Sequence, residues 1–98
     1  MKVVFMGTPG FAVPCLEALL ASDADVVGVV SQPDRPKGRG RKLQPTPTAA
    51  VARERGIPLF QWARLNQGSF DQLKALNADL FVVVAYGKIL PKRYLALP

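Results

Sequence analysis

The sequence predicts an α/β fold built on a parallel sheet, and two observations carry this expectation. Short apolar stretches alternate along the chain with stretches of helical spacing, which is the pattern of strand–helix–strand units joined by right-handed crossovers. The segments 26–30 and 79–85 are apolar at nearly every position, which is typical of parallel strands covered on both faces. For the four strands that follow, we expect the spatial order 3-2-1-4.

Each element is predicted from its own residues. Strands are expected at 2–6, 26–30, 58–61 and 79–85, and helices at 11–21, 48–55, 69–77 and 91–97. The first helix has a buried stripe at helical spacing, formed by Ala12, Leu16, Leu19 and Leu20. Gly56 is expected to cap the second helix in a left-handed conformation, and Pro58 places the third strand at an edge of the sheet.

The third helix shows a start signal, because Ser69 and Gln72 have the spacing of a capping box. Its inward residues are expected to be Phe70, Leu73 and Leu76. We find no internal repeat and no low-complexity tract along the chain. Its 98 residues are therefore expected to form no more than one small domain.

Composition narrows the possible chemistry. Cys15 is the only cysteine, so an internal disulfide is excluded, and we expect Cys15 to be a small packed residue in a reducing compartment. The chain has no histidine, which is the usual general base near neutral pH. We find no signal peptide and no apolar run of membrane-spanning length. The expected location is the cytoplasm, with no membrane and no metal.

The segment 32–47 is the most unusual part of the chain. It holds five cations, Arg35, Lys37, Arg39, Arg41 and Lys42, beside a single acid, Asp34. Because prolines and glycines recur through it, we expect a long loop without regular helix or sheet, and such loops are usually functional. A merely solvated insertion is the alternative. The clustered charge favours a surface for a large anionic partner.

A ligand site is expected where three connections meet. In the predicted sheet order, the first and fourth strands are neighbours whose helices leave in opposite directions, so a crevice opens at their carboxyl ends. The turns at Gly7 and Gly87 form its two lips, and the basic loop leaves the second strand at the same edge. The first turn does not match a dinucleotide-binding fingerprint, and Gln32 stands where a ribose-binding acid belongs. A nucleotide-binding half-domain is therefore disfavoured.

Several residues near this crevice have two readings. Gly7 and Gly10 either permit a tight turn or face a ligand, and Tyr86 either packs or lines a pocket. Phe11 and Leu16 are expected in the core rather than in a pocket. The remaining cations of this region, Lys88, Lys92 and Arg93, are expected to be solvated.

Three segments together resemble the start of the methionyl-tRNA formyltransferase family. They are Phe5–Ala12, Val29–Pro47 and Val82–Pro91, read in order over essentially the whole chain. The middle segment is the most specific, because formyltransferases that act on small substrates lack this loop. The resemblance implies a Rossmann-like formyltransferase fold, of which this chain would be the N-terminal and incomplete part, followed in the family by a β-barrel domain.

The resemblance also implies a reaction. The family transfers a formyl group from 10-formyltetrahydrofolate to the amino group of methionine on initiator tRNA, during translation initiation. The implied partners are initiator methionyl-tRNA and 10-formyltetrahydrofolate, and the complete protein is expected to be a monomer. The alternative is a small basic RNA-binding module without catalysis.

Residue roles follow from matching the family motifs. The tRNA-binding residues would be Arg35, Lys37, Arg39, Arg41 and Lys42, with Arg39 in a Gly-Arg-Gly motif tied to the acceptor end. The aminoacyl-end pocket would comprise Gly7, Thr8, Pro9 and Phe11, and the folate pocket Tyr86, Gly87, Lys88, Ile89 and Leu90. The catalytic asparagine and histidine of an Asn-x-His motif, and a catalytic aspartate, are expected beyond Pro98. The 98 residues alone are therefore expected to be inactive.

Overall fold

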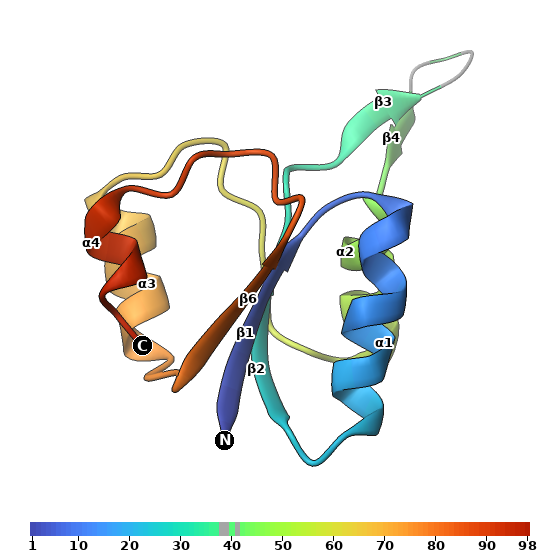
Figure 1. Ribbon diagram of the computed structural model, residues 1–98. Coiled ribbons are helices and arrows are strands. Elements are labelled where there is room, and N and C mark those ends of the chain that lie inside the picture. Colours follow the sequence, from blue (N-terminus) through green and yellow to red (C-terminus); the bar gives the residue numbers. More distant parts are fainter. Residues whose placement is uncertain (38–39, 41) are drawn as a thin grey trace.

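The protein has a four-stranded parallel sheet with helices on both faces (Figure 1). The computed structural model describes residues 1–37, 40 and 42–98. The strands are β1 (Lys2–Gly7), β2 (Asp25–Val30), β5 (Leu59–Phe60) and β6 (Leu80–Val84), in the spatial order β5-β2-β1-β6. This is the predicted order, and β5 lies at the edge where Pro58 placed it.

The helices form two layers around the sheet. They are the 3-10 turn η1 (Gly10–Ala12) and the helices α1 (Val13–Ala21), α2 (Pro47–Arg55), α3 (Gln67–Ala75) and α4 (Lys92–Leu95). Figure 1 shows α1 and α2 on one face, and α3 and α4 on the other. The left-handed Gly56 ends α2 as predicted, at a φ of 68°.

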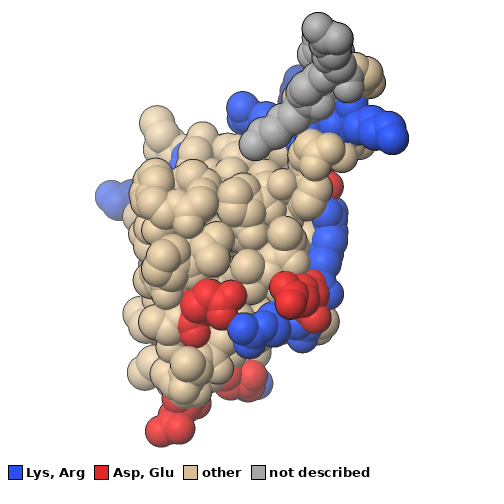
Figure 2. All heavy atoms as spheres, turned by 90° about the vertical axis from the view of Figure 1, so that its right-hand side faces the viewer, with Lys and Arg blue, Asp and Glu red and all other residues tan. Residues whose placement is uncertain are grey.

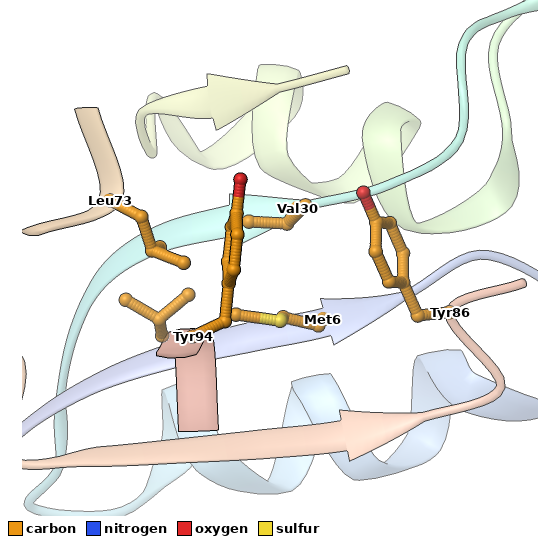
Figure 3. Packing of buried hydrophobic residues seen from close by; sticks show 6 residues of the cluster. Met6, Val30, Leu73, Tyr86 and Tyr94 are labelled. Atoms are coloured by element: carbon orange, nitrogen blue, oxygen red, sulfur yellow. The ribbon is translucent and has the colours of Figure 1, made fainter. Parts of the chain in front are cut away.

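Alternation along the strands divides the core in two. Successive side chains of a strand point to opposite faces, so Val4 and Met6 pack with α3 and α4, whereas Phe5 packs with α1 and α2. The first cluster, seen in Figure 3, contains Val4, Met6, Val30, Leu73, Tyr86 and Tyr94. The second contains Phe5, Ala12, Leu16, Val29 and Ala52, with Cys15 partly buried against it. Strands apolar on both faces are thus explained by two helical layers.

The basic segment is not the irregular loop that we predict from its prolines and glycines. It contains a two-stranded antiparallel ribbon, β3 (Arg35–Lys37) and β4 (Lys42–Gln44), with Pro36 opposite Leu43. A two-stranded ribbon has only edge strands, where a missing N–H can be tolerated. The expectation was therefore wrong, because proline excludes a central strand and not an isolated hairpin.

Two further sequence expectations were wrong in detail. The N-cap of α3 is Asn66, whose Oδ1 accepts from the Ser69 backbone N–H at 3.0 Å, while Ser69 Oγ accepts from the Asn66 backbone N–H at 2.8 Å. Ser69 is thus the third helical residue of the capping box instead of its start. Phe11 is 72% exposed and does not belong to the core, since the 3-10 turn directs it away from the sheet.

The outer edge of the sheet is only half covered. Leu80 and Val83 of β6 are 44% and 47% exposed, although this strand has the apolar sequence of a buried one. In the described sheet β6 pairs on one side with β1, which is almost entirely buried, and its other side is an edge. The sequence of β6 is therefore more apolar than expected for a strand that the described residues cover only in part.

Two tyrosines in the first cluster differ in how their hydroxyls are satisfied. The Tyr94 hydroxyl lies 2.6 Å from Ser69 Oγ and donates to the Asn66 carbonyl at 3.0 Å. The Tyr86 hydroxyl is equally buried but has no hydrogen-bond partner among residues 1–37, 40 and 42–98. Burial, with the neighbouring Tyr94, raises the pKa of Tyr86 to about 12. Its phenolate is thus disfavoured in the folded state, which loses stability as pH rises from 10 towards this value.

This contrast gives a matched pair of stability tests. We expect Tyr86→Phe to raise the free energy of unfolding by about 1 kcal/mol, because it removes a buried hydroxyl that lacks a partner. We expect Tyr94→Phe to lower it by about 1–2 kcal/mol, because two hydrogen bonds are lost. Urea unfolding at neutral pH measures both values. Equal effects of the two substitutions would contradict the difference between the hydroxyls.

Candidate functional site: a pocket at the foot of the basic ribbon

The predicted convergence of three connections is observed as a pocket. It has a volume of about 470 Å³ and lies beyond the carboxyl ends of β1, β2 and β6, at the foot of the ribbon. Its lining comes from Thr8, Pro9, Gly10, Gln32, Arg35, Gln44, Pro45, Thr46, Pro47, Ala85, Tyr86 and Gly87. The two predicted lips and the base of the basic segment therefore share one cavity.

The Thr8 hydroxyl joins the three connections. It donates to the Tyr86 carbonyl at 2.7 Å and accepts from the Gln32 backbone N–H at 3.2 Å. Tyr86 and Gln32 lie two residues after the ends of β6 and β2, whereas Thr8 directly follows β1. A hydroxyl suits this place because it donates and accepts at the same time. Thr8 thus holds the floor of the pocket together.

Gly7 is explained by close packing. A Cβ on Gly7 would lie 2.6 Å from the Val84 carbonyl oxygen and 2.7 Å from the Phe5 ring. The Gly7 carbonyl itself accepts from the Thr48 hydroxyl at 2.6 Å, which ties α2 to β1. Gly10 differs, because no described atom lies within 4 Å of a Cβ built there, and it lines the pocket. Of the two glycines, only Gly10 has space beside it for a ligand.

The second lip has an unusual backbone. Ala85 and Gly87 have φ angles of 51° and 96°, and the buried Tyr86 ring lies between them in sequence. A positive φ costs energy for alanine and persists only where the surroundings impose it. The Tyr86 ring anchors this lip in the first core cluster (Figure 3). Both readings of Tyr86 therefore hold, since its ring packs and the residue also lines the pocket.

Gln32 links the two sides of the pocket, a role that the sequence did not reveal. Its Oε1 accepts from Lys88 Nζ at 2.7 Å, so Lys88 is not the purely solvated cation that we expected. A Cβ on Gly87 would approach Gln32 Nε2 to 2.8 Å, so the glycine makes room for this side chain. The only available signal was a polar residue close to the end of an apolar strand.

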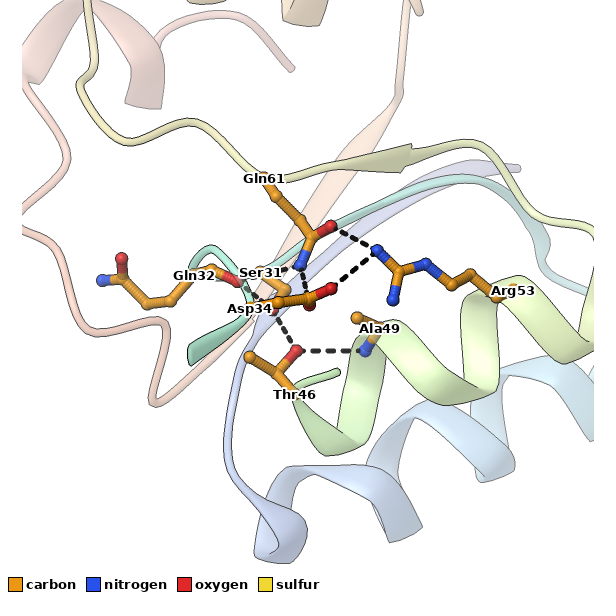
Figure 4. Close-up of polar contacts among 7 residues, drawn as sticks. All are labelled: Ser31, Gln32, Asp34, Thr46, Ala49, Arg53 and Gln61. Atoms are coloured by element: carbon orange, nitrogen blue, oxygen red, sulfur yellow. Dashed lines mark hydrogen bonds and ion pairs between the residues drawn. The ribbon is translucent and has the colours of Figure 1, made fainter. Parts of the chain in front are cut away.

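A second polar cluster fixes the base of the ribbon (Figure 4). Asp34 stands directly before β3 and accepts from Gln61 Nε2 at 2.6 Å and from Arg53 Nη2 at 3.0 Å. Arg53 of α2 also donates to Gln61 Oε1 at 2.9 Å. Gln61 Nε2 lies 3.2 Å from the Gln32 carbonyl. We refer to Asp34, Arg53 and Gln61 as the clamp.

The clamp changes the acidity of Asp34. Partial burial by itself would raise the pKa of the Asp34 carboxyl, whose side chain is 20% exposed. The hydrogen bonds from Gln61 and Arg53, the Arg53 charge and the Thr46 backbone outweigh this effect and lower the pKa below its ordinary value of 3.8. The carboxylate form is thus favoured by folding.

The other end of the ribbon is held by Thr46. Its hydroxyl accepts from the Ala49 backbone N–H at 3.2 Å as the N-cap of α2, and it also contacts Ser31 Oγ. Thr46 lies two residues after β4. Each strand of the ribbon is therefore attached to the body of the protein close to its base, β3 through Asp34 and β4 through Thr46.

Charge is unevenly distributed over the molecule. On the face that carries α1 and α2, Figure 2 shows Lys and Arg at the ribbon end and further along the side of the molecule, whereas most Asp and Glu lie away from the ribbon. Within the part of the chain that the structure describes, Arg35 and Lys42 of the ribbon form no ion pair, and the two ion pairs present join Arg53 to Asp34 and Arg55 to Glu17. The described ribbon cations are thus available to an anionic ligand.

Not every residue predicted for the site meets at the pocket. Thr8, Pro9, Arg35, Tyr86 and Gly87 line it, whereas Gly7, Phe11, Lys88, Ile89, Leu90 and Lys42 do not. Ile89 is 95% exposed, and Leu90 packs against the first core cluster. Arg39, Arg41 and the side chain of Lys37 lie outside the described residues.

Across the described ranges, no helix combines the length and the apolar character that crossing a membrane requires. In the same residues, His, Cys, Asp and Glu form no group of three or more that could hold a metal ion. The pocket lining instead combines amide and hydroxyl side chains with prolines, Tyr86 and the ribbon cation Arg35.

Comparison with known proteins identifies the class to which this fold and pocket belong. A family model described as "Formyl transferase" matches residues 1–98, so the chain belongs to the formyl transferase family. A solved structure, the phosphoribosylglycinamide formyltransferase of Anaplasma phagocytophilum, matches with a TM-score of 0.65 at 19% identity and covers 97% of this chain and 43% of that one. The predicted Rossmann-like α/β formyltransferase fold is confirmed.

Similar curated proteins are more specific. Methionyl-tRNA formyltransferases of Kosmotoga olearia, Sulfurihydrogenibium sp. and Clostridioides difficile are 54%, 52% and 50% identical over 100% of this chain. The resemblance found in the sequence is thereby confirmed. The chain spans about a third of the length of these relatives, 32% in each case.

The Thr8 hydroxyl can be tested by a shape-conserving change. Thr8→Val keeps the volume but leaves the Tyr86 carbonyl and the Gln32 N–H without their partner, so we expect a loss of about 1–3 kcal/mol in the free energy of unfolding. Thr8→Ser keeps the hydroxyl and should lose less than half as much. Urea unfolding measures both variants. Valine and serine variants of equal stability would contradict the linking role.

The clamp predicts a pH dependence. Because the folded protein lowers the pKa of Asp34, the stability that this carboxylate contributes should be present above pH 3.8 and be lost as pH falls through the lowered value. We expect Asp34→Asn to reduce the free energy of unfolding at pH 7 and to have a much smaller effect near pH 3. Denaturant unfolding at both pH values measures this, and an effect that does not change with pH would contradict it.

Proposed function

We propose that the protein carrying this chain transfers a formyl group from 10-formyltetrahydrofolate to the methionyl amino group of initiator tRNA, and so acts in translation initiation. The observation that carries this proposal is the identity of 50–54% with methionyl-tRNA formyltransferases over the entire chain. The basic ribbon beside the pocket supports it, because a tRNA substrate requires a cationic surface close to the donor.

In this proposal residues 1–98 are the N-terminal part of a formyltransferase catalytic domain. Attack by the methionyl amine requires proton transfer and stabilisation of a tetrahedral oxyanion. We assign these steps to an Asn-x-His motif and an aspartate beyond Pro98, with a β-barrel domain following. The described residues would bind and orient the two substrates. The protein would be a cytoplasmic monomer that uses no metal.

The second lip would hold the formyl donor. Its residues Tyr86, Gly87, Lys88, Ile89 and Leu90 combine a strained backbone, an anchored ring and an exposed aliphatic side chain. A pteridine has flat apolar faces and hydrogen-bonding edges, which suit backbone groups and the nearby Gln32 amide. The pocket of about 470 Å³ has a size compatible with such a ring.

The first lip and the ribbon would receive the tRNA. We assign the aminoacyl end to Gly7, Thr8, Pro9 and Phe11, and the acceptor stem to Arg35, Lys37, Arg39, Arg41 and Lys42. Arg35 supports this arrangement, because it belongs to both the ribbon and the pocket lining. Phe11 is exposed beside the first lip, where a ring can stack on an unpaired base.

The function is tested by incubating the full-length protein with 10-formyltetrahydrofolate and charged initiator tRNA, and by following formyl-methionine by mass spectrometry. Formylated tRNA would support the proposal. Binding of tRNA without formyl transfer would overturn it and favour the alternative, an RNA-binding module without catalysis.

A substitution in the ribbon separates the two substrates. We expect Arg39→Ala to raise KM for charged tRNA by about tenfold, as for the loss of one Arg contact of 1–3 kcal/mol. Arg35→Ala should act in the same direction on tRNA. For Arg39→Ala, KM for the formyl donor should stay within about twofold, since in this proposal the donor is held by the second lip, whereas the ribbon contacts the phosphates of the tRNA. Steady-state kinetics at fixed ionic strength measures these constants.

Lys74→Ala is the matched control, because it removes one exposed cation from α3, which lies on the face of the sheet opposite to α1 and α2 (Figure 1). It should leave both constants unchanged. An Arg39 variant with unaltered tRNA kinetics, or one that loses donor binding equally, would defeat the assignment of the ribbon.

A further inference from the structure

We propose that Asp34 is a positioning residue for the tRNA substrate, which fixes the direction of the ribbon over the pocket by holding its first leg to α2 and β5. This inference rests on the proposed function for its kinetic consequence. Its structural part concerns the clamp alone and can be tested separately.

The ribbon has few other attachments. Its two strands pair only with each other, and no residue described for them belongs to either core cluster. Leu43, the one large apolar residue of β4, is 67% exposed. The direction of the ribbon is therefore set at its two feet, by the clamp on one side and by Thr46 on the other.

A small rotation at the feet is enlarged along the ribbon. Strands advance about 3.3 Å per residue, so three-residue strands carry their far ends on the order of 10 Å from the clamp. A basic hairpin that pivots freely still attracts RNA, but it does not present its cations in a fixed relation to the pocket. Productive binding needs that relation, because misplacement of a substrate by about 1 Å can cost much of the rate.

The partners of Asp34 indicate that its charge does not serve to neutralise the ribbon. Asp34 is the only acid in segment 32–47, which also holds five cations. It nevertheless pairs with Arg53 of α2 and accepts from Gln61, which follows β5. The described ribbon cations Arg35 and Lys42 take part in neither ion pair. The acid therefore attaches the ribbon to the body and leaves the charge of the described ribbon residues uncompensated.

The clamp needs a carboxylate. Both Gln61 Nε2 and Arg53 Nη2 donate, each to a different oxygen of Asp34. An asparagine offers one oxygen and one N–H₂ group, so it can satisfy only one of the two donors and turns its amide hydrogens towards the other. Asp34→Asn therefore breaks the clamp with little change in shape.

The kinetic effect of this change has an informative sign. Removing an acid from a basic surface strengthens attraction to RNA if only net charge matters. Loss of positioning acts in the opposite direction. A rise in KM for tRNA in the Asp34→Asn variant is therefore evidence of geometry and not of charge.

Glu17→Gln is the matched control. Glu17 of α1 pairs with Arg55 of α2 at 2.8 Å, and both side chains are about half exposed, at 42% and 48%. The change removes the same charge from an ion pair with the same helix, but the hydrogen bond and ion pair described for Glu17 go to Arg55 and not to the ribbon. It reports the effect of charge and of a lost surface ion pair without a change in the clamp.

The experiment measures formylation of charged initiator tRNA by the full-length protein. For Asp34→Asn we expect KM for tRNA to rise about fivefold, equivalent to ~1 kcal/mol, with KM for the formyl donor unchanged. Glu17→Gln should leave KM for tRNA unchanged or lower it slightly. Asp34→Glu, which keeps the charge and both oxygens, should recover at least part of the wild-type value. A lowered or unchanged KM in Asp34→Asn would overturn the proposal.

A second measurement does not depend on activity. Trypsin cleavage after Lys42 under native conditions should be several-fold faster in Asp34→Asn than in the wild type or in Glu17→Gln, after correction for global stability by urea unfolding. Equal cleavage rates would overturn the positioning role. A wild-type protein that forms no formyl-methionine would overturn the proposed function instead, and the cleavage rates would then decide the structural part by themselves.

Discussion

The site depends on the Thr8 hydroxyl, which connects three segments that are far apart in the sequence. A parallel sheet brings the carboxyl ends of β1, β2 and β6 to one edge, but it does not fix the connections that leave them. One hydroxyl does so by donating to the Tyr86 carbonyl and accepting from the Gln32 N–H. The connections that line the pocket are therefore held in place by a single side-chain hydroxyl.

The packing beneath this contact explains why the neighbouring residues are small. Gly7 allows the Val84 carbonyl and the Phe5 ring to approach closely, and Thr48 satisfies the Gly7 carbonyl from α2. On the other lip, Gly87 makes room for Gln32, whose amide accepts from Lys88. Both lips therefore contact Gln32, which follows β2. The Gln32 backbone N–H donates to Thr8 of the first lip, and the Gln32 side chain accepts from Lys88 of the second.

The ribbon shows how a small α/β protein can carry a concentrated positive charge. Two antiparallel strands form hydrogen bonds between part of their backbone N–H and carbonyl groups. The ribbon projects from the body of the protein, so its described cations Arg35 and Lys42 stay exposed to solvent. The one nearby acid is directed into the clamp with Arg53 and Gln61 (Figure 4). Attraction for an anion and attachment to the fold are therefore assigned to different residues.

Sequence reasoning succeeded where the signal was local or followed from topology. The alternation of elements predicted the sheet order, Gly56 and Pro58 were placed correctly, and the meeting of both lips with the basic segment followed from the rule for parallel sheets. It failed where a residue type allows two environments. Pro36 is compatible with an isolated hairpin, and Ser69 can serve as the third residue of a capping box as well as its first.

The sequence by itself therefore determined the α/β class, the order of the strands, the edge of the sheet where a site forms and the family to which the chain belongs. These properties follow from hydrophobic periodicity and from motifs, which act over a few residues. Only the tertiary structure decided that Gln32 pairs with Lys88, that Asp34 pairs with α2, and that Phe11 is exposed. Both pairings join different elements of the chain, Gln32 and Lys88 being 56 residues apart, and their contacts depend on how two helical layers and a sheet pack against one another.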